Sequence, residues 1–115
     1  MAKKVLVVDD SAIVRNIHSF MLKSAGFEVT EASNGYEAME KLLPTQFDLV
    51  VTDINMPNGM GGIEFIKKIQ QQQLTTPIIA MSGYLKNSEA IKALPKEVPL
   101  MEKPVNLRIL VQKIN

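Results

Sequence analysis

The sequence predicts an α/β domain: a five-stranded parallel sheet, doubly wound, with helices on both faces. Short apolar runs alternate along the chain with longer segments whose apolar residues recur every three or four positions. Most of these runs contain no polar residue, as expected for strands buried on both faces. Short strands joined by helices of this length require parallel, right-handed crossovers. The 115 residues fit one domain, covering residues 1–115.

Five segments are predicted strands, and one of them differs from the rest. The continuous apolar runs are Val5–Val8, Leu49–Val51, Pro77–Met81 and Pro99–Met101. The segment from Phe27 to Ala32 instead alternates apolar and polar residues, so one of its faces meets water. We therefore place residues 27–32 at an edge of the sheet.

The segments between the strands carry helical apolar stripes. For residues 12–25 the stripe is Ile13, Val14, Ile17, Met21 and Ala25, and Gly26 ends the helix. Asn34 and Glu37 resemble a capping box that starts a second helix. Its predicted buried residues, before Pro44, are Ala38, Met39, Leu42 and Leu43. The remaining stripes are Ile63, Phe65, Ile66 and Ile69; Ile91 and Leu94 in a short helix before Pro95; and Leu107, Leu110, Val111 and Ile114.

Composition argues against several classes of function. Thirteen basic and twelve acidic residues leave a formal charge of +1, so we expect no nucleic-acid partner. The chain has no cysteine, which excludes disulfides and thiol chemistry and fits a reducing compartment. Only four apolar residues follow Lys4 before the first aspartate, too few for a signal peptide or a membrane span. We expect a soluble, cytoplasmic protein.

Polar residues follow the predicted strands at their carboxyl ends. Asp9 and Asp10 follow the first strand and Asp53 the third, while Ser82 ends the fourth and Lys103 follows the fifth. Open parallel sheets bind ligands at this edge, where the strand order reverses. With residues 27–32 outside the first strand, the order becomes 2-1-3-4-5 and the three carboxylates converge in one crevice.

Three converging carboxylates require a compensating positive charge, because like charges at short range resist ionisation. Mg²⁺ prefers oxygen ligands and commonly binds one or two carboxylates together with phosphate. A phosphoryl group on Asp53 would present oxygens to the metal, to Lys103 and to the Ser82 hydroxyl. Asp53 as nucleophile would form an aspartyl phosphate. The residues therefore indicate phosphoryl transfer to Asp53.

Four motifs carry a family resemblance over essentially the whole chain: Val7–Ser11, Val51–Pro57, Met81–Gly83 and Glu102–Pro104. Together they resemble the receiver domain of two-component response regulators, nearest to the single-domain chemotaxis type. The resemblance implies a flavodoxin-like, CheY-like fold. The strand order given above is that of this fold, so the two predictions are not independent.

The resemblance also implies how Mg²⁺ is bound. Asp10 and Asp53 would give carboxylate oxygens and Asn55 its backbone carbonyl, while Asp9 would act mainly through a bound water. Asp53 would accept its phosphoryl group from the phosphohistidine of a sensor histidine kinase or a histidine phosphotransfer protein.

Further expectations from the resemblance concern the phosphoryl group and the signal. Ser82 would hydrogen-bond one phosphoryl oxygen and Lys103 another, and the Lys103–Pro104 peptide bond would be cis. The family usually carries Tyr or Phe where this chain has Leu100, so the switch is expected to differ, with Tyr84 as a substitute. A downstream protein would bind the face formed by the fourth helix, last strand and fifth helix, on a monomer or weak dimer.

Other functions are less well supported by the residues. A receiver that is never phosphorylated usually lacks an acid or the lysine, and this chain keeps both. A haloacid-dehalogenase-type phosphatase would have a second aspartate two residues after Asp53, where this chain has Asn55. A flavin site would need a phosphate-binding loop where Asp9 and Asp10 would repel the phosphate. The one histidine, His18, is predicted to be a surface or partly buried residue without a catalytic role.

Overall fold

The computed structural model describes residues 2–56, 60–72, 74–83 and 89–114. The strands are β1 (Lys4–Val8), β2 (Glu28–Ala32), β3 (Leu49–Asp53), β4 (Ile78–Ser82) and β5 (Leu100–Glu102). The helices are α1 (Ala12–Ser24), α2 (Gly35–Leu42), α3 (Gly62–Gln71), α4 (Glu89–Ala93) and α5 (Leu107–Ile114). Strands and helices alternate, as the sequence predicts.

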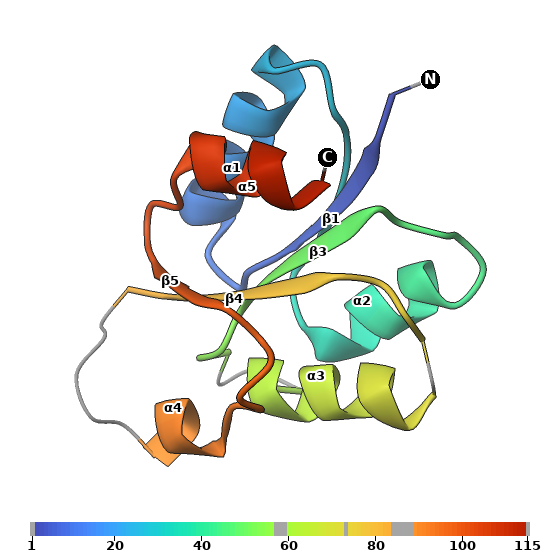
Figure 1. The fold of residues 1–115 in the computed structure, drawn as a ribbon, viewed down its shortest axis with the longest axis vertical. Coiled ribbons are helices and arrows are strands. Elements are labelled where there is room, and N and C mark those ends of the chain that lie inside the picture. Colours follow the sequence, from blue (N-terminus) through green and yellow to red (C-terminus); the bar gives the residue numbers. More distant parts are fainter. Residues whose placement is uncertain (1, 57–59, 73, 84–88, 115) are drawn as a thin grey trace.

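The sheet is entirely parallel, with strand order β2-β1-β3-β4-β5. This confirms the predicted order and the edge position of β2. Helices α1 and α5 cover one face, and α2, α3 and α4 cover the other (Figure 1). All five strands therefore end at the same edge, where the predicted site residues lie.

The core has one layer on each side of the sheet. Val5 and Val7 of β1 pack with residues of α1 and α5, whereas Leu6 and Val8 pack with residues of α2 and α3. Successive strand residues point to opposite faces. A central strand therefore needs apolar residues on both faces, which accounts for the unbroken runs Val5–Val8 and Leu49–Val51.

Helix α1 does not bury the stripe predicted for it. Ile13 and Ile17 are 74% and 48% exposed, and the fully buried side chains are His18, Ser19 and Leu22. The helix has apolar residues around most of its circumference, so periodicity fits more than one face. Packing against α5 and the sheet selects the face that contains His18. The prediction of a surface or partly buried His18 was therefore wrong.

The other helices agree better with prediction. In α3 the side chains of Phe65, Ile66 and Ile69 are fully buried. In α2, Leu42 is buried but Leu43, the residue that follows the helix, is 60% exposed, so its predicted burial was wrong. The short α4 is confirmed at five residues. No helix in the described ranges is long and apolar enough to cross a bilayer.

Local signals at the helix ends are confirmed. The Asn34 side chain accepts a hydrogen bond from the backbone N–H of Glu37 at 2.9 Å. The Glu37 carboxylate in turn accepts from the N–H of Ser33, one residue earlier than in a standard capping box. After α1, Gly26 adopts φ +94°, a conformation that favours glycine.

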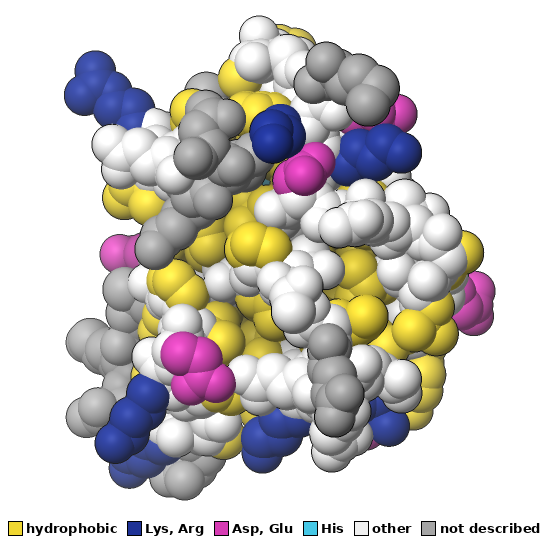
Figure 2. All heavy atoms as spheres, turned by 45° about the vertical axis from the view of Figure 1, so that its right-hand side comes forward, with side chains coloured by type: hydrophobic (Ala, Val, Ile, Leu, Met, Phe, Trp, Pro, Cys, Tyr) yellow, Lys and Arg dark blue, Asp and Glu magenta, His cyan; other side chains and the backbone are white. Residues whose placement is uncertain are grey.

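The face turned toward the viewer in Figure 2 carries basic and acidic side chains scattered around apolar ones. Neither sign gathers into a continuous patch on this face.

Candidate functional site

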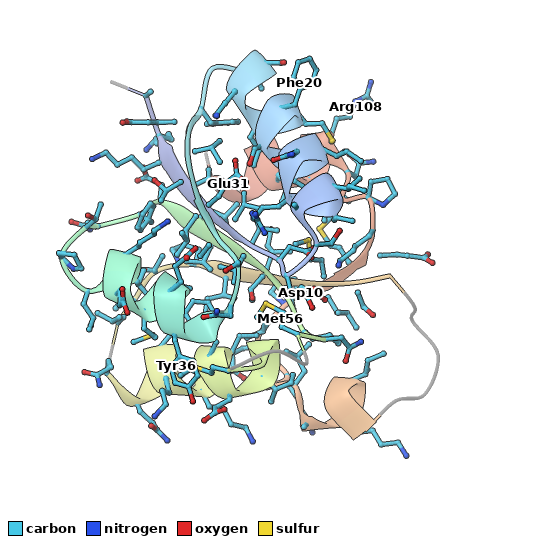
Figure 3. All side chains as sticks on the ribbon, turned by 180° about the vertical axis from the view of Figure 1, so that it is seen from behind. Asp10, Phe20, Glu31, Tyr36, Met56 and Arg108 are labelled. Atoms are coloured by element: carbon cyan, nitrogen blue, oxygen red, sulfur yellow. The ribbon has the colours of Figure 1, made fainter. Side chains whose placement is uncertain are left out.

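Asp9 and Asp53 stand side by side at the ends of the two central strands. The register pairs Val8 of β1 with Thr52 of β3, and each aspartate is the next residue. Both side chains are buried. Asp10 is more exposed and also lies at the strand ends (Figure 3), and one oxygen from each of the three carboxylates lies within 4.8 Å of the others. The predicted convergence of the three acids is thus present.

Each buried aspartate is oriented by a backbone N–H two residues ahead. The N–H of Ser11 donates to Asp9 Oδ1 at 2.9 Å, and that of Asn55 donates to Asp53 Oδ1 at 3.0 Å. These hydrogen bonds fix one oxygen of each carboxylate. The other oxygen, Oδ2, is directed toward a cation.

That cation is Lys103, whose Nζ lies 2.8 Å from Asp9 Oδ2 and 2.9 Å from Asp53 Oδ2. The Lys103 backbone N–H donates to the carbonyl of Ser82 at 2.9 Å, and the Lys103–Pro104 peptide bond is cis. Burial by itself lowers the pKa of the ammonium. Its hydrogen bonds to Asp9 and Asp53 outweigh that effect, so the pKa of Lys103 is raised. Lys103 is therefore a permanent positive charge between two carboxylates.

One ammonium does not balance the acids. Burial raises the pKa of Asp53, although the N–H of Asn55 and the charge of Lys103 oppose this shift and Asp9 adds to it. Three carboxylates and one ammonium leave two uncompensated negative charges, and all the donor atoms are oxygens. Both features match what a hard divalent cation requires. Asp9, Asp10 and Asp53 could therefore hold Mg²⁺ without any rearrangement of their strands.

The remaining predicted residues lie around this group with different burial. Ser82 is the last residue of β4 and fully buried, and its neighbour Met81 pairs with Asp53. Asn55 is exposed, and Leu100 is half-buried against the cluster of Ile54, Ile66, Ala80 and Val98. Tyr84 lies outside the described residues, so its predicted switch role stays a prediction.

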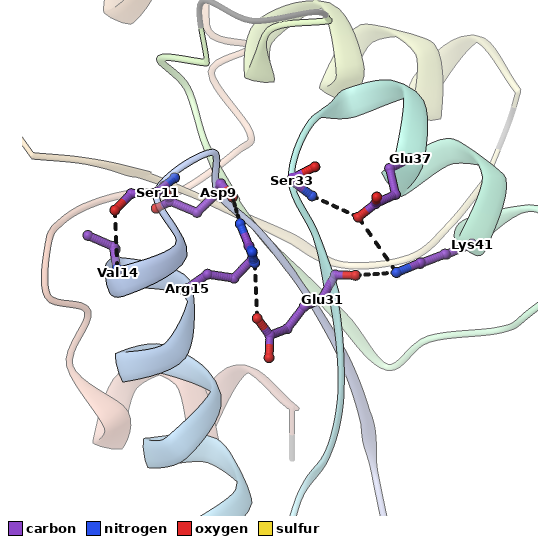
Figure 4. Close-up of polar contacts among 8 residues, drawn as sticks. All are labelled: Asp9, Ser11, Val14, Arg15, Glu31, Ser33, Glu37 and Lys41. Atoms are coloured by element: carbon purple, nitrogen blue, oxygen red, sulfur yellow. Dashed lines mark hydrogen bonds and ion pairs between the residues drawn. The ribbon is translucent and has the colours of Figure 1, made fainter.

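Arg15 of α1 belongs to the surroundings of the site and was missed by the sequence reasoning. Its Nη1 donates to the backbone carbonyl of Asp9 at 2.8 Å, and its Nε pairs with Glu31 at 3.0 Å (Figure 4). Lys41 then contacts both the Glu31 carbonyl and the Glu37 carboxylate. The sequence did contain a signal for this ion pair. Arg15 is a basic residue one turn into α1, and Glu31 is an acidic residue on the edge strand β2.

His18 is the second residue that was missed. It is 1% exposed, and its Nε2 accepts a hydrogen bond from the backbone N–H of Val105 at 3.2 Å. The imidazole also lines a shallow groove of about 230 Å³ with Val14, Ile17, Lys103 and Pro104. His18 therefore joins α1 to the segment that carries the lysine.

Gly62, the first residue of α3, packs against the backbone at the end of β3. A Cβ atom at this position would overlap the backbone carbonyl oxygen of Asp53. The first turn of α3 therefore packs directly on the end of β3, which only glycine allows.

Comparison with known proteins gives a consistent result. The model of the family "Response regulator receiver domain" matches residues 5–115. The chemotaxis protein CheY of Thermotoga maritima is 39% identical over all of this chain and 97% of its own length. Chemotaxis protein CheY4 of Vibrio cholerae has a similar structure, with a TM-score of 0.85 and 34% identity over the whole of both chains.

A further similar structure is response regulator TrrA of Thermotoga maritima, described as a complex with Mg²⁺ and BeF. Its TM-score is 0.81 and its identity 30%, over 98% of this chain and 99% of that one. Other curated relatives are longer, and the chain spans 48% of one and 26% of another. With a family match over nearly its whole length, the chain belongs to the response regulator receiver domains of two-component signalling.

Proposed function

We propose that the chain is a stand-alone receiver, residues 1–115, that accepts a phosphoryl group on Asp53 and thereby changes its contact with a downstream protein. The observation that carries this proposal is the position of Lys103 Nζ, 2.8 and 2.9 Å from two buried carboxylates at adjacent strand ends. The donor would be the phosphohistidine of a sensor histidine kinase or a histidine phosphotransfer protein. The chain would catalyse only its own phosphorylation and dephosphorylation.

In the proposed reaction an oxygen of Asp53 forms the bond to phosphorus. The bond from phosphorus to the imidazole nitrogen of the donor breaks, and the nitrogen keeps the electron pair. The Lys103 ammonium and the Ser82 hydroxyl would each meet one phosphoryl oxygen and offset its charge. Burial of Asp53 removes water that would otherwise weaken these interactions.

The same proposal assigns the metal ligands. Asp10, Asp53 and the backbone carbonyl of Asn55 would bind Mg²⁺ directly, and Asp9 mainly through a water. The metal supplies positive charge that reduces the repulsion between these carboxylates and an incoming phosphoryl group. TrrA, a protein of similar structure and 30% identity, is described as a complex with Mg²⁺ and BeF, which supports Mg²⁺ as the metal.

The structure argues against a receiver that works only by protein contact. Two buried carboxylates cost free energy, because burial penalises their charge. A module without phosphoryl chemistry would gain from replacing them with neutral residues. Their presence next to Lys103 favours chemistry at Asp53.

Helix α1 offers a surface that a phosphodonor would contact. Ile13, Ile17 and Phe20 are exposed on successive turns, and Ile17 borders the groove that ends at Lys103. Because Lys103 also contacts Asp53, this exposed surface lies beside the proposed reaction site. We propose α1 as the donor contact, and the face of α4, β5 and α5 as the contact for the downstream protein.

Phosphoryl uptake is tested directly by incubation with Mg²⁺ and acetyl phosphate, followed by mass spectrometry of the intact chain. We expect one phosphoryl adduct, which Asp53→Asn abolishes. Asp48→Asn, at the opposite end of β3, is the matched control and should leave the adduct unchanged. Absence of an adduct at every donor concentration, or its persistence in Asp53→Asn, would refute the proposal.

Donor contact is tested by Ile17→Lys on α1. Transfer from a phosphorylated histidine phosphotransfer protein should slow by about tenfold, because a charge replaces an apolar contact. The rate with acetyl phosphate should not change, since that donor needs no protein surface. Tyr36→Lys, at an exposed position on α2 (Figure 3), is the control. Equal slowing by both variants would remove α1 as the contact.

A further inference from the structure

We propose that His18 is a positioning residue for Lys103, acting through its hydrogen bond to the backbone of Val105. The proposal rests on the phosphoryl transfer proposed for Asp53. Lys103 reaches the carboxylates directly, and His18 holds the segment from which Lys103 projects.

The segment that carries the lysine, residues 103–105, is held by one hydrogen bond at each end. At its start the N–H of Lys103 donates to the carbonyl of Ser82 at 2.9 Å. Pro104 has no N–H, so the next backbone donor is Val105, and its N–H donates to His18 Nε2 at 3.2 Å. The first bond ties the segment to β4 and the second ties it to α1.

The His18 bond lies in a dry part of the molecule. Val105 is 2% exposed and His18 1%, so water does not reach this N–H when the imidazole is present. A side chain without an acceptor would leave the donor buried and unpaired, and the segment would have to move to satisfy it. The position therefore requires an acceptor as well as apolar bulk.

The imidazole is in the form that can accept. Because Nε2 receives a hydrogen bond, the proton is on Nδ1, which is buried without a hydrogen-bond partner among the described residues. Burial lowers the pKa of His18; the carboxylate of Asp9 opposes this and the charge of Lys103 adds to it. Geometry and surroundings both keep His18 neutral near pH 7.

Lys103 needs this support because β5 holds it weakly. The strand has three residues and pairs with β4 alone, and Lys103 follows its last residue. Helix α1 begins two residues after Asp10, and the N–H of Ser11 and the side chain of Arg15 both bind Asp9. Through His18 the same helix therefore also holds the segment of Lys103. A displacement of about 1 Å in such a group costs up to about a hundredfold in rate.

The test compares His18→Leu, His18→Asn and His18→Gln. Leucine has no acceptor and asparagine is too short to reach Val105, whereas glutamine places its amide oxygen near the position of Nε2. In NMR spectra of the metal-free chain, the Lys103 ammonium should be protected from exchange in the unsubstituted and Gln proteins. It should lose protection by tenfold or more in the Leu and Asn variants.

Phosphorylation by acetyl phosphate should follow the same order. The rate should fall about tenfold in the Leu and Asn variants and stay within about threefold in the Gln variant. In a Lys103→Met background, His18→Leu should cause no further loss, because its effect passes through the ammonium. A purely structural role would give the same loss in both backgrounds and no rescue by glutamine.

The outcomes separate this inference from the function on which it rests. If the unsubstituted chain takes up no phosphoryl group, the proposed function fails and the ammonium signal still tests the positioning. If the unsubstituted chain is phosphorylated, and a folded His18→Leu variant keeps both the protected Lys103 ammonium signal and the phosphorylation rate, the positioning role of His18 is wrong. The proposed function would then still stand. If His18→Leu does not fold, the comparison of Asn with Gln decides.

Discussion

Helices α3 and α1 follow the two central strands, and both show strong apolar periodicity, yet they use it differently. In α3 the side chains of Ile66 and Ile69 are fully buried against the sheet. In α1, Ile13 and Ile17 remain exposed, and the buried face includes His18. The comparison shows that periodicity measures how much apolar surface a helix has, while the neighbours of the helix decide which part is buried. The helix beside the lysine thus leaves apolar side chains exposed, among them Ile13 and Phe20.

The largest expected difference between the two helices is in stability. Ile66→Ala should lower the free energy of unfolding by about 2–5 kcal/mol, because it leaves a cavity in a closed core. Ile17→Ala should change it by no more than about 0.5 kcal/mol, since about half of the side chain is in water already and its removal leaves no closed cavity. Urea denaturation of both variants measures the difference. Similar losses would mean that α1 packs through the stripe predicted from its sequence.

A smaller effect is expected from pH, through His18. Its pKa is lowered in the folded chain from about 6.5, so below that pH the unfolded chain binds a proton that the folded chain does not. The free energy of unfolding is therefore highest above pH 6.5 and falls as pH drops toward the folded pKa, by up to about 1.4 kcal/mol per unit. Denaturation of the unsubstituted chain and of His18→Gln between pH 5.5 and 7.5 isolates this slope. Equal slopes in the two proteins would contradict the assignment, because the chain has no other histidine.

The cap at the start of α1 should contribute about as much to the free energy of unfolding as one hydrogen bond does. Ser11 caps this helix, its side chain accepting from the N–H of Val14 at 3.3 Å. Ser11→Ala should therefore lower the free energy of unfolding by about 1 kcal/mol. Thermal denaturation, with Ser24→Ala at the exposed end of the same helix as control, measures the cap. A loss no greater than that of the control would show that the cap contributes nothing.

The smallest effect is expected at the start of α3, whose cap residue Gly61 makes no side-chain hydrogen bond. A Cβ there would lie 3.9 Å from the carbonyl of Met56, an ordinary contact. Gly61→Ser should raise the free energy of unfolding by a few tenths, about 0.3 kcal/mol, since serine supplies the missing acceptor. A decrease would indicate that α3, unlike α1, requires an uncapped start.

The part of the site that lies at the carboxyl ends of the strands was predictable from the sequence. Asp9 and Asp53 had to converge once β1 and β3 were neighbours, because parallel strands end at one edge. His18 was not predictable in the same way. Its burial depends on the side of α1 that meets Val105, which lies 87 residues later in the chain. Leu43 was also misplaced: its backbone is still helical, but its side chain is exposed, and periodicity alone does not show where the buried stripe of α2 stops.

The contact of Gly62 with the carbonyl of Asp53 has a consequence for protein design. A designer who transfers the acidic residues and the lysine to another parallel sheet would also have to transfer this glycine and the helix that starts there. Saturation mutagenesis at residue 62 should recover glycine alone. The portable unit is therefore a strand together with its following helix, rather than a set of side chains.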